Sequence, residues 1–247
     1  MEPRLQLAQD KALARLIRAF KSRQPDTVNA YLKALGTLHT LSWLNVLLIF
    51  WQEPGASNVN RPSAWSKLSR QVVKGSKRIL ISNVQALEKR YVYDVGDTKG
   101  EQVVDTPWIH GDADCYLILI QHHIGQLGIV LNYPGSATNL STRNEVTIKK
   151  GMPAATEFPV LCKELARQLQ TREGRKTTRH LQDLELEATI FILTSTLRLK
   201  NCSVTTDFIG LYQEGPEQLA ESLNFIQRTS SQLIEVCLCQ FHMGGAQ

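Results

Sequence analysis

The sequence predicts an α+β protein with two domains: a helical N-terminal module that carries a small sheet, and an α+β domain that ends in three helices. Most apolar residues recur at helical spacing over long stretches, and the alternating stretches are few and short. Charge is unevenly divided, because residues 1–90 carry 15 Lys and Arg against 5 Asp and Glu, and residues 91–247 carry 13 against 18. We expect a basic domain over 1–95, a linker rich in Gly, Asp, Thr and Pro over 96–112, and a second domain over 113–247.

The N-terminal domain is predicted to consist of helices packed on two strands. Apolar residues over 5–20 keep helical spacing, with Arg15, Arg18 and Lys21 off that face, and Pro25 follows as a stop. Pro54 and Gly55 mark a turn after a strongly apolar stretch. The further elements expected here are helices near 27–36, 42–51 and 64–68 and strands near 77–84 and 90–95.

The C-terminal domain is predicted to begin with a helix and to contain two strands before its three closing helices. Pro134 and Gly135 form the expected turn between the strands. The expected elements are a helix near 114–124, strands near 128–133 and 145–149, and helices near 155–171, 179–200 and 216–241.

Composition indicates a globular, cytoplasmic protein. The five cysteines, at 115, 162, 202, 237 and 239, are too sparse for a disulfide framework and are expected to be reduced thiols. The longest apolar stretch, residues 41–51, is well short of the roughly 20 residues that span a bilayer. No signal peptide is expected, since the first basic residues lie inside an amphipathic repeat. The sequence predicts no cofactor and no membrane partner.

Residues 163–167 read KELAR and have the spacing of the H-E-x-x-H pattern with cations at both metal-ligand positions. In that pattern two histidines one helical turn apart bind Zn²⁺, and the glutamate acts on the metal-bound water. Lys163 and Arg167 are protonated and repel a dication. The helix therefore predicts a degenerate metal site with no bound metal and no catalytic residues.

Short motifs surround this helix in a defined order. Residues 135–139 (GSATN) and 144–148 (NEVTI) precede it, and Glu185, Ala188 and Phe191 follow on a later helix. This order resembles the C-terminal metallopeptidase domain of the ArdC-type antirestriction proteins of conjugative plasmids. The resemblance implies a zincin-like fold, and it implies that Glu185 stands where the family has its third zinc ligand.

The N-terminal half carries a second series of motifs: 39–49 (HTLSWLNVLLI), 52–56 (QEPGA), Trp65, 70–75 (RQVVKG), 77–81 (KRILI) and 92–98 (VYDVGDT). The series up to residue 81 resembles the single-stranded-DNA-binding domain of the same family, with Ser69 in place of the expected glycine before Arg70, and residues 92–98 resemble the connector between the family's two domains. Together the two resemblances cover about residues 10–235. They imply a protein that shields incoming plasmid DNA from restriction.

Single-stranded DNA is bound by cations that follow phosphates and by flat side chains on which bases stack. The candidates for this role are Trp65, Lys67, Arg70, Lys74, Lys77 and Arg78. Trp43 and Trp51, eight residues apart on an apolar helix, are expected to pack inward. Asn45 is expected to tie down a loop by hydrogen bonds, because an amide among apolar residues is costly without partners.

At the degenerate metal site we expect an ion pair or triad of Glu185 with Arg167 and Lys163, which would replace the metal as the tie between two helices. Glu164 retains the position of the general base without a metal-bound water, and a surface or supporting role is favoured for it. Cys237, Cys239 and His242 could form a metal clip, but the end of an amphipathic helix explains them better.

The predicted function is sequence-independent binding of single-stranded DNA, with a catalytically inactive C-terminal domain that serves as a scaffold or a partner-binding surface. Two alternatives stay open. One is a non-enzymatic interaction protein that acts on a host defence or nucleoprotein complex. The other is a peptidase that uses unusual metal ligands.

Overall fold

The computed structural model describes residues 3–83, 88–103, 111–134, 140–142, 144–172, 174, 177–199, 207–213 and 215–239. The chain forms two compact units, Met1–Thr106 and Pro107–Gln247, which are described separately below. The α+β class predicted from the sequence is confirmed. The helix Val95–Asp97 and the strand β5 (Thr98–Gly100) belong to the first unit, so the segment predicted as a linker begins inside it.

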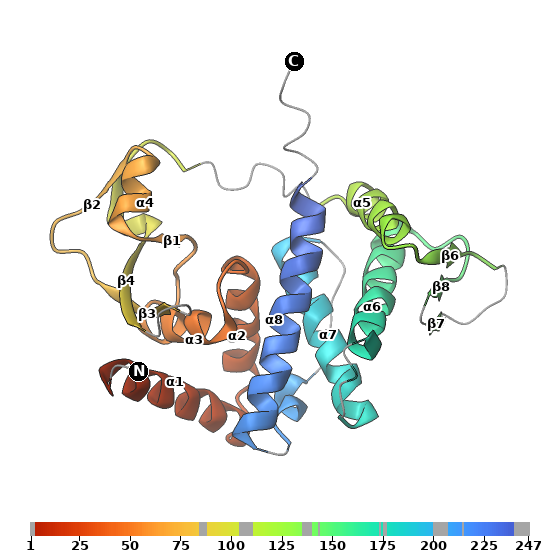
Figure 1. The fold of residues 1–247 in the computed structure, drawn as a ribbon, viewed down its shortest axis with the longest axis horizontal. Helices are drawn as coiled ribbons and strands as arrows, with labels where there is room; N and C mark the ends of the chain where they lie inside the picture. Colours follow the sequence, from red (N-terminus) through yellow and green to blue (C-terminus); the bar gives the residue numbers. More distant parts are fainter. Residues whose placement is uncertain are drawn as a thin grey trace. The chain divides into compact units, whose positions relative to one another are not determined.

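The first unit opens with three helices, α1 (Pro3–Lys21), α2 (Pro25–Thr37) and α3 (Trp43–Gln52), which contact one another (Figure 1). Pro25 occupies the first turn of α2, where its missing N–H costs nothing. Ser42 caps α3, because its hydroxyl accepts a hydrogen bond from the backbone N–H of Asn45. The apolar stripe of α1 is buried as its spacing predicts, with Leu5 and Leu16 fully enclosed.

The strands of the first unit form two small antiparallel sheets. One has the order β1 (Val59–Asn60), β4 (Glu88–Asp94), β3 (Ile79–Asn83). The other pairs β2 (Arg70–Val72) with β5 and lies next to the short helix α4 (Pro62–Lys67). β1, β2 and β5 were not predicted, because two or three residues are too few to show an alternating pattern.

The strand register gives the three-stranded sheet two different faces. Ile79 lies opposite Val92, and both side chains are buried together with that of Ile81. Leu80 lies opposite Tyr91 on the other face, where Tyr91 is 41% exposed. One face therefore belongs to the core of the unit, and the other face reaches the surface.

Two amides on α3 bind the outer edge of β3. Asn45 donates to the carbonyl of Ser82 and accepts from its N–H, at 3.0 and 2.8 Å. Gln52, two turns later, makes the same pair of bonds with the backbone of Leu80 at 2.9 Å each. Side chains thus satisfy an edge that would otherwise be open for pairing. Asn45 has the structural role expected of it, but it holds a strand rather than a loop.

The described part of the second unit contains four long helices: α5 (Ala113–Gln126), α6 (Ala154–Arg172), α7 (Arg179–Thr196) and α8 (Pro216–Cys239). α5 packs on α6, α6 on α7, and α7 on α8, while α8 also contacts α5. A one-turn helix, Phe208–Leu211, packs against α7. The three closing helices predicted from the sequence are present. Their expected last residues, 200 and 240–241, lie outside the described part of the chain.

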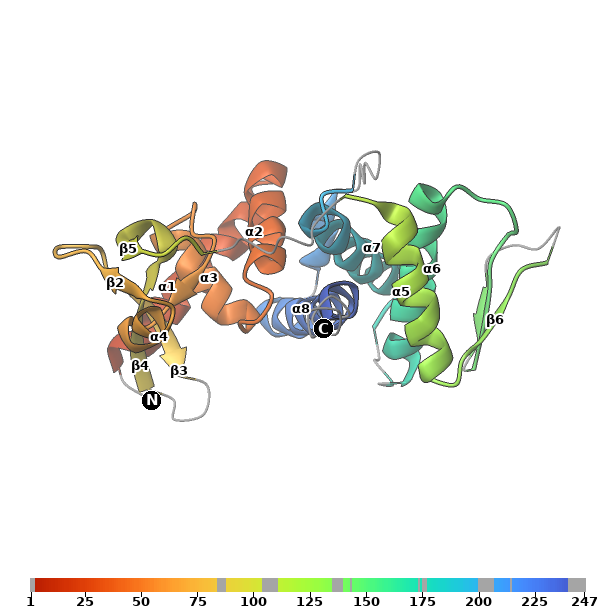
Figure 2. The same cartoon turned by 90° about the horizontal axis from the view of Figure 1, so that it is seen from above.

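A small sheet completes the second unit, with the order β6 (Val130–Asn132), β8 (Glu145–Thr147), β7 (Leu140–Thr142). β6 runs parallel to β8, and β7 runs antiparallel to it. Figures 1 and 2 show the sheet beside α5 and α6, on the side away from α8. β7 was not predicted, and the motif at 135–139 lies outside the described residues. None of the described helices is long and apolar enough to cross a membrane.

Candidate functional site

The two cations of the degenerate metal site lie one turn apart on α6 and both reach α7. Lys163 Nζ lies 3.1 Å from Glu187 Oε1, and Arg167 Nη1 lies 3.1 Å from Asp183 Oδ1. Arg167 Nε also lies 3.6 Å from Glu164 Oε2 on its own helix. These side chains are about one-third exposed, except that of Glu164, which is buried. The two cations therefore join α6 to α7 through Glu187 and Asp183.

The predicted partner of the cations was wrong. Glu185 is fully buried, and its carboxylate accepts hydrogen bonds from Gln170 Nε2 at 2.8 Å and from Ser222 Oγ on α8 at 2.7 Å. Asp183 and Glu187 are four residues apart and share a helix face, whereas a residue midway between them is rotated by about 200°. Because of this helix geometry, Asp183 and Glu187 form the ion pairs, and Glu185 faces the interior.

Glu164 is buried and supports Arg167, which is one of the two roles that the sequence favoured for it. Its residue is 8% exposed, and its carboxylate pairs with Arg167. The described part of the chain contains no group of three or more His, Cys, Asp or Glu that could hold a metal ion near Glu164 or elsewhere. A divalent metal needs deprotonated or neutral donors. These residues do not fit a divalent metal ion. Lys163 and Arg167 are cations, and the carboxylate of Glu185 already accepts hydrogen bonds from an amide and a hydroxyl.

The cysteine clip considered from the sequence is also unsuited to bind a metal ion, judged from Cys237, its described member. Cys237 is fully buried, and burial raises the pKa of its thiol to about 12. A thiol must lose its proton to ligate a metal, so this one is a poor donor at neutral pH. The Cys239 side chain and His242 lie outside the described residues.

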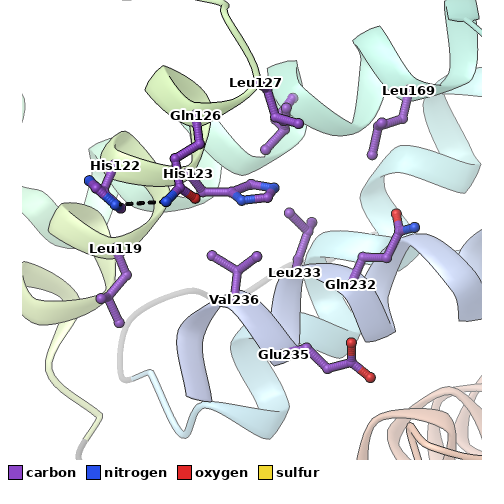
Figure 3. Close-up of a pocket in the computed structure, with 11 residues that line it drawn as sticks. Leu119, His122, His123, Gln126, Leu127, Leu169, Gln232, Leu233, Glu235 and Val236 are labelled. Carbon is purple, nitrogen blue, oxygen red and sulfur yellow. Dashed lines mark hydrogen bonds between the residues drawn. The ribbon is translucent and has the colours of Figure 1, made fainter. Parts of the chain in front are cut away.

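A pocket of about 470 Å³ lies between α5, α6 and α8 (Figure 3). Its α6 residues, Leu165 and Leu169, are each two positions beyond Lys163 and Arg167 and so lie on a different face of that helix. His123 points into the pocket, and burial and then the neighbouring His122 lower its pKa. Among the described residues, the lining contains no Ser or Cys nucleophile, and it is suited to apolar groups.

A polar cluster fixes the end of β6 to the helices. The phenol of Tyr133 donates to Glu157 Oε1 at 2.7 Å and accepts from Gln121 Nε2 at 2.8 Å. Burial, followed by the hydrogen bond to Glu157, raises the pKa of Tyr133 to about 12. The phenol is neutral under ordinary conditions and holds α5, α6 and the strand together.

In the first unit, two of the residues predicted to bind DNA are structural. Trp65 is fully buried, and its Nε1 donates to the carbonyl of Tyr93 at 3.0 Å. Arg70 donates to Thr98 Oγ1 at 2.7 Å, to the Thr98 carbonyl at 3.0 Å and to the carbonyls of Gly100 and Glu101. Trp65 cannot stack on a base, and the guanidinium of Arg70 is occupied in holding β2 on β5. Both expectations of DNA contact are corrected.

The other four predicted cations are exposed, and three of them lie on the loop between β2 and β3. Lys67 ends α4, and Lys74 stands at a turn where Gly75 adopts φ of 92°, a conformation that favours glycine. Lys77 donates to the carbonyl of Gln52 and lies 3.3 Å from Glu53 Oε2. Arg78 lies over the ring of Tyr91, with its Cζ 5.9 Å from the centroid. The loop therefore presents three exposed cations, and Lys67 adds a fourth at the end of α4.

Sequence reasoning overlooked the aromatic residues beside this surface. Tyr91 and Tyr93 alternate along β4, so both lie on the face of the sheet opposite Ile79 and Ile81. The alternation Tyr-Val-Tyr at residues 91–93 was the sequence signal that could have revealed this aromatic face. Trp51 was expected in the core but is half-buried. The centroid of its ring lies 5.8 Å from the Cζ of Arg15. Trp51 and Lys11 both line a hollow of about 220 Å³.

No protein-family model and no curated protein sequence matches the chain significantly. Among solved structures, two forms of one protein are similar to it over nearly the whole length of the chain. The metal-free crystal structure of the antirestriction protein ArdC from plasmid R388 is 13% identical, with a TM-score of 0.50 and coverage of 96% of this chain and 98% of that one. The Mn(II)-bound structure is 12% identical, with a TM-score of 0.53 and coverage of 97% and 99%. The resemblance to the ArdC type is confirmed at the level of the fold: this chain has the fold of the R388 ArdC protein.

Proposed function

We propose that this protein binds single-stranded DNA through its first unit and acts as an antirestriction protein of the ArdC type. The observation that carries the proposal is the cationic surface of Lys67, Lys74, Lys77 and Arg78, whose side chains are exposed, whereas Trp65 is in the core and Arg70 is hydrogen-bonded to β5. It lies in the half of the chain where 15 Lys and Arg stand against 5 Asp and Glu. A surface of this kind follows phosphates without reading sequence.

The second unit is proposed to act without a metal and without peptidase chemistry. Its former ligand positions are held by cations paired with Asp183 and Glu187, and Glu185 is held by Gln170 and Ser222. A coat that shields DNA needs a stable scaffold and no hydrolysis. Elemental analysis of the purified chain tests this directly, with less than one metal ion per ten chains expected at roughly micromolar protein. One tightly held equivalent of zinc or manganese would refute it.

Binding is tested by fluorescence anisotropy with single-stranded DNA, duplex DNA and RNA over a series of salt concentrations. Each neutralised phosphate contributes ~0.7 to the slope of log affinity against log salt on a single strand. Lys74→Gln is expected to lower that slope by ~0.7. Lys33→Gln, an equal change of charge at an exposed position of α2, is the matched control and is expected to leave the slope unchanged. Tighter binding to duplex or RNA than to single-stranded DNA would contradict the proposal.

A second candidate function is supported by the exposed apolar residues of the second unit. Ile118 is 65% exposed on α5, Val130 is 57% exposed on β6, and Leu127 is 38% exposed at the edge of the pocket in Figure 3. Exposed apolar residues near a pocket are typical of a protein-binding surface. A stoichiometric protein partner lost in Ile118→Glu, with no DNA affinity in the intact chain, would favour this interaction function over DNA binding.

A further inference from the structure

We propose that Tyr91 and Tyr93, together with Arg78, form a stacking platform for the bases of single-stranded DNA. The proposal rests on the proposed function, and it names the residues that recognise the unpaired state of the strand. Cations alone bind any polyanion, so preference for a single strand needs groups that contact exposed bases.

The platform follows from the register of β3 and β4. Ile79 pairs with Val92 and Ile81 with Arg90, which places the alternate positions Leu80, Tyr91 and Tyr93 on the opposite face. Tyr91 leaves 41% of its surface exposed, although the face behind it carries the buried side chains of Ile79, Ile81 and Val92. The core therefore does not require this ring. Two rings spaced two residues apart on one strand can each accept a base, since every base has a flat π-face.

Arg78 adds a second flat group at the same place. It immediately precedes β3, and its guanidinium lies over the ring of Tyr91 with Cζ 5.9 Å from the centroid. A guanidinium can stack on a base and also bind a phosphate through its N–H fork. Arg78 is exposed, and it forms no ion pair among the residues that the structure describes. Its charge is thus available to the backbone of a bound strand.

The charges around the platform favour a polyanion. Lys77 adjoins Arg78, and Lys89 lies on the same face as Tyr91, because it pairs with Ser82 in the register. Asp94, the acid at the end of β4, is engaged elsewhere, since its carboxylate accepts from the backbone N–H groups of Ser57, Asn58 and Gly96. Lys89, Tyr91 and Tyr93 thus share this face, and the guanidinium of Arg78 lies over Tyr91. The occupant that fits is an unpaired strand, because the bases of a duplex already stack on one another.

The test compares two labelled oligomers of equal length, oligothymidylate and a strand of abasic sites that keeps the phosphates and lacks the bases. Tyr91→Ala is expected to weaken binding of oligothymidylate by roughly 5- to 150-fold, the loss of one stacked base. It is expected to leave binding of the abasic strand within roughly twofold, because no charge is removed. Tyr91→Phe keeps the ring and is expected to match the native chain on both oligomers.

Leu7→Ala, which removes an exposed apolar side chain from α1, is the matched control and is expected to bind like the native chain. Circular dichroism and thermal unfolding establish that each variant is folded. If the native chain binds no single-stranded DNA, the proposed function fails. If the native chain binds and Tyr91→Ala binds equally well, or loses the same factor on both oligomers, the function stands and the stacking platform is refuted.

Discussion

The carboxylate of Glu185 accepts a hydrogen bond from the hydroxyl of Ser222 at 2.7 Å, in the buried interior of the second unit. Its other oxygen accepts from the side-chain amide of Gln170 at 2.8 Å. The residue that resembles a metal ligand is therefore one member of a hydrogen-bond network that joins α6, α7 and α8. This network, and not an ion pair with Arg167, joins the three helices at the centre of the unit.

Removal of this carboxylate should destabilise the protein substantially. Glu185→Ala leaves the amide of Gln170 and the hydroxyl of Ser222 without their acceptor, and we expect a loss of about 2–4 kcal/mol in the free energy of unfolding. Asp183→Ala, two residues away and 41% exposed, is the control and should cost less than about 1 kcal/mol. Urea denaturation measures both. Equal losses in the two variants would contradict the network.

The ion pairs between α6 and α7 should contribute little. A buried pair would have cost about 3–5 kcal/mol on removal of one partner. Arg167 and Asp183 are 33% and 41% exposed, so water screens them, and a double-mutant cycle should give a coupling of ~0.2–1 kcal/mol that declines with salt. A coupling above about 2 kcal/mol that is indifferent to salt would show that the pair behaves as a buried one.

Substitution of Trp65 should lower the stability of the folded protein, and any effect on DNA binding should follow from that loss. The ring is fully buried and its N–H is bonded to the Tyr93 carbonyl, so Trp65→Ala should cost about 3–5 kcal/mol. Tyr91→Ala, at an exposed position, should leave the thermal midpoint nearly unchanged. Calorimetry of the two variants separates a core residue from a surface residue. A stable Trp65→Ala variant with weakened DNA binding would restore the stacking role that we have withdrawn.

Tyr133 should make stability depend on pH in the alkaline range. Its pKa is about 12 in the folded protein, and a tyrosine in the unfolded chain has a pKa of about 10. The folded state therefore retains a proton that the unfolded state releases. This stabilisation is complete below about pH 10 and is lost as the pH rises through about 12.

The measurement is the thermal midpoint of the native chain and of Tyr133→Phe between about pH 8 and 12. The variant cannot release this proton, so its midpoint should fall less steeply with pH. Burial also raises the pKa of Tyr31. Both proteins contain Tyr31, so it lowers the thermal midpoint of both at alkaline pH. Identical slopes for the two proteins would show that Tyr133 ionises in the folded protein as it does in water.

The helices could be predicted from sequence because their apolar residues repeat over many turns. The stretch expected at 5–20 is α1 (Pro3–Lys21), and the one at 155–171 is α6 (Ala154–Arg172). The short strands could not be predicted this way. β2 pairs Arg70 with Gly100, thirty residues apart, and neither strand is long enough to display an alternating pattern. Such pairing is decided by tertiary contacts.

The candidate site could be predicted only in part, for a related reason. Several motif residues that carry the ArdC resemblance are used inside the fold: Asn45 and Gln52 bind the edge of β3, Trp65 is in the core, and Arg70 holds β5. Motifs of this kind identify a fold before they identify a ligand. The exposed lysines were found from their charge, but the aromatic face beside them required the register of β3 and β4.

The most direct test of this account is the affinity of the intact chain for single-stranded DNA as a function of salt. If Lys67, Lys74, Lys77 and Arg78 contact phosphates, log affinity should fall with log salt at a slope of roughly 2 to 3, and duplex DNA should bind more weakly at every salt concentration. An affinity that does not change with salt, or that is as strong for duplex as for the single strand, would contradict it.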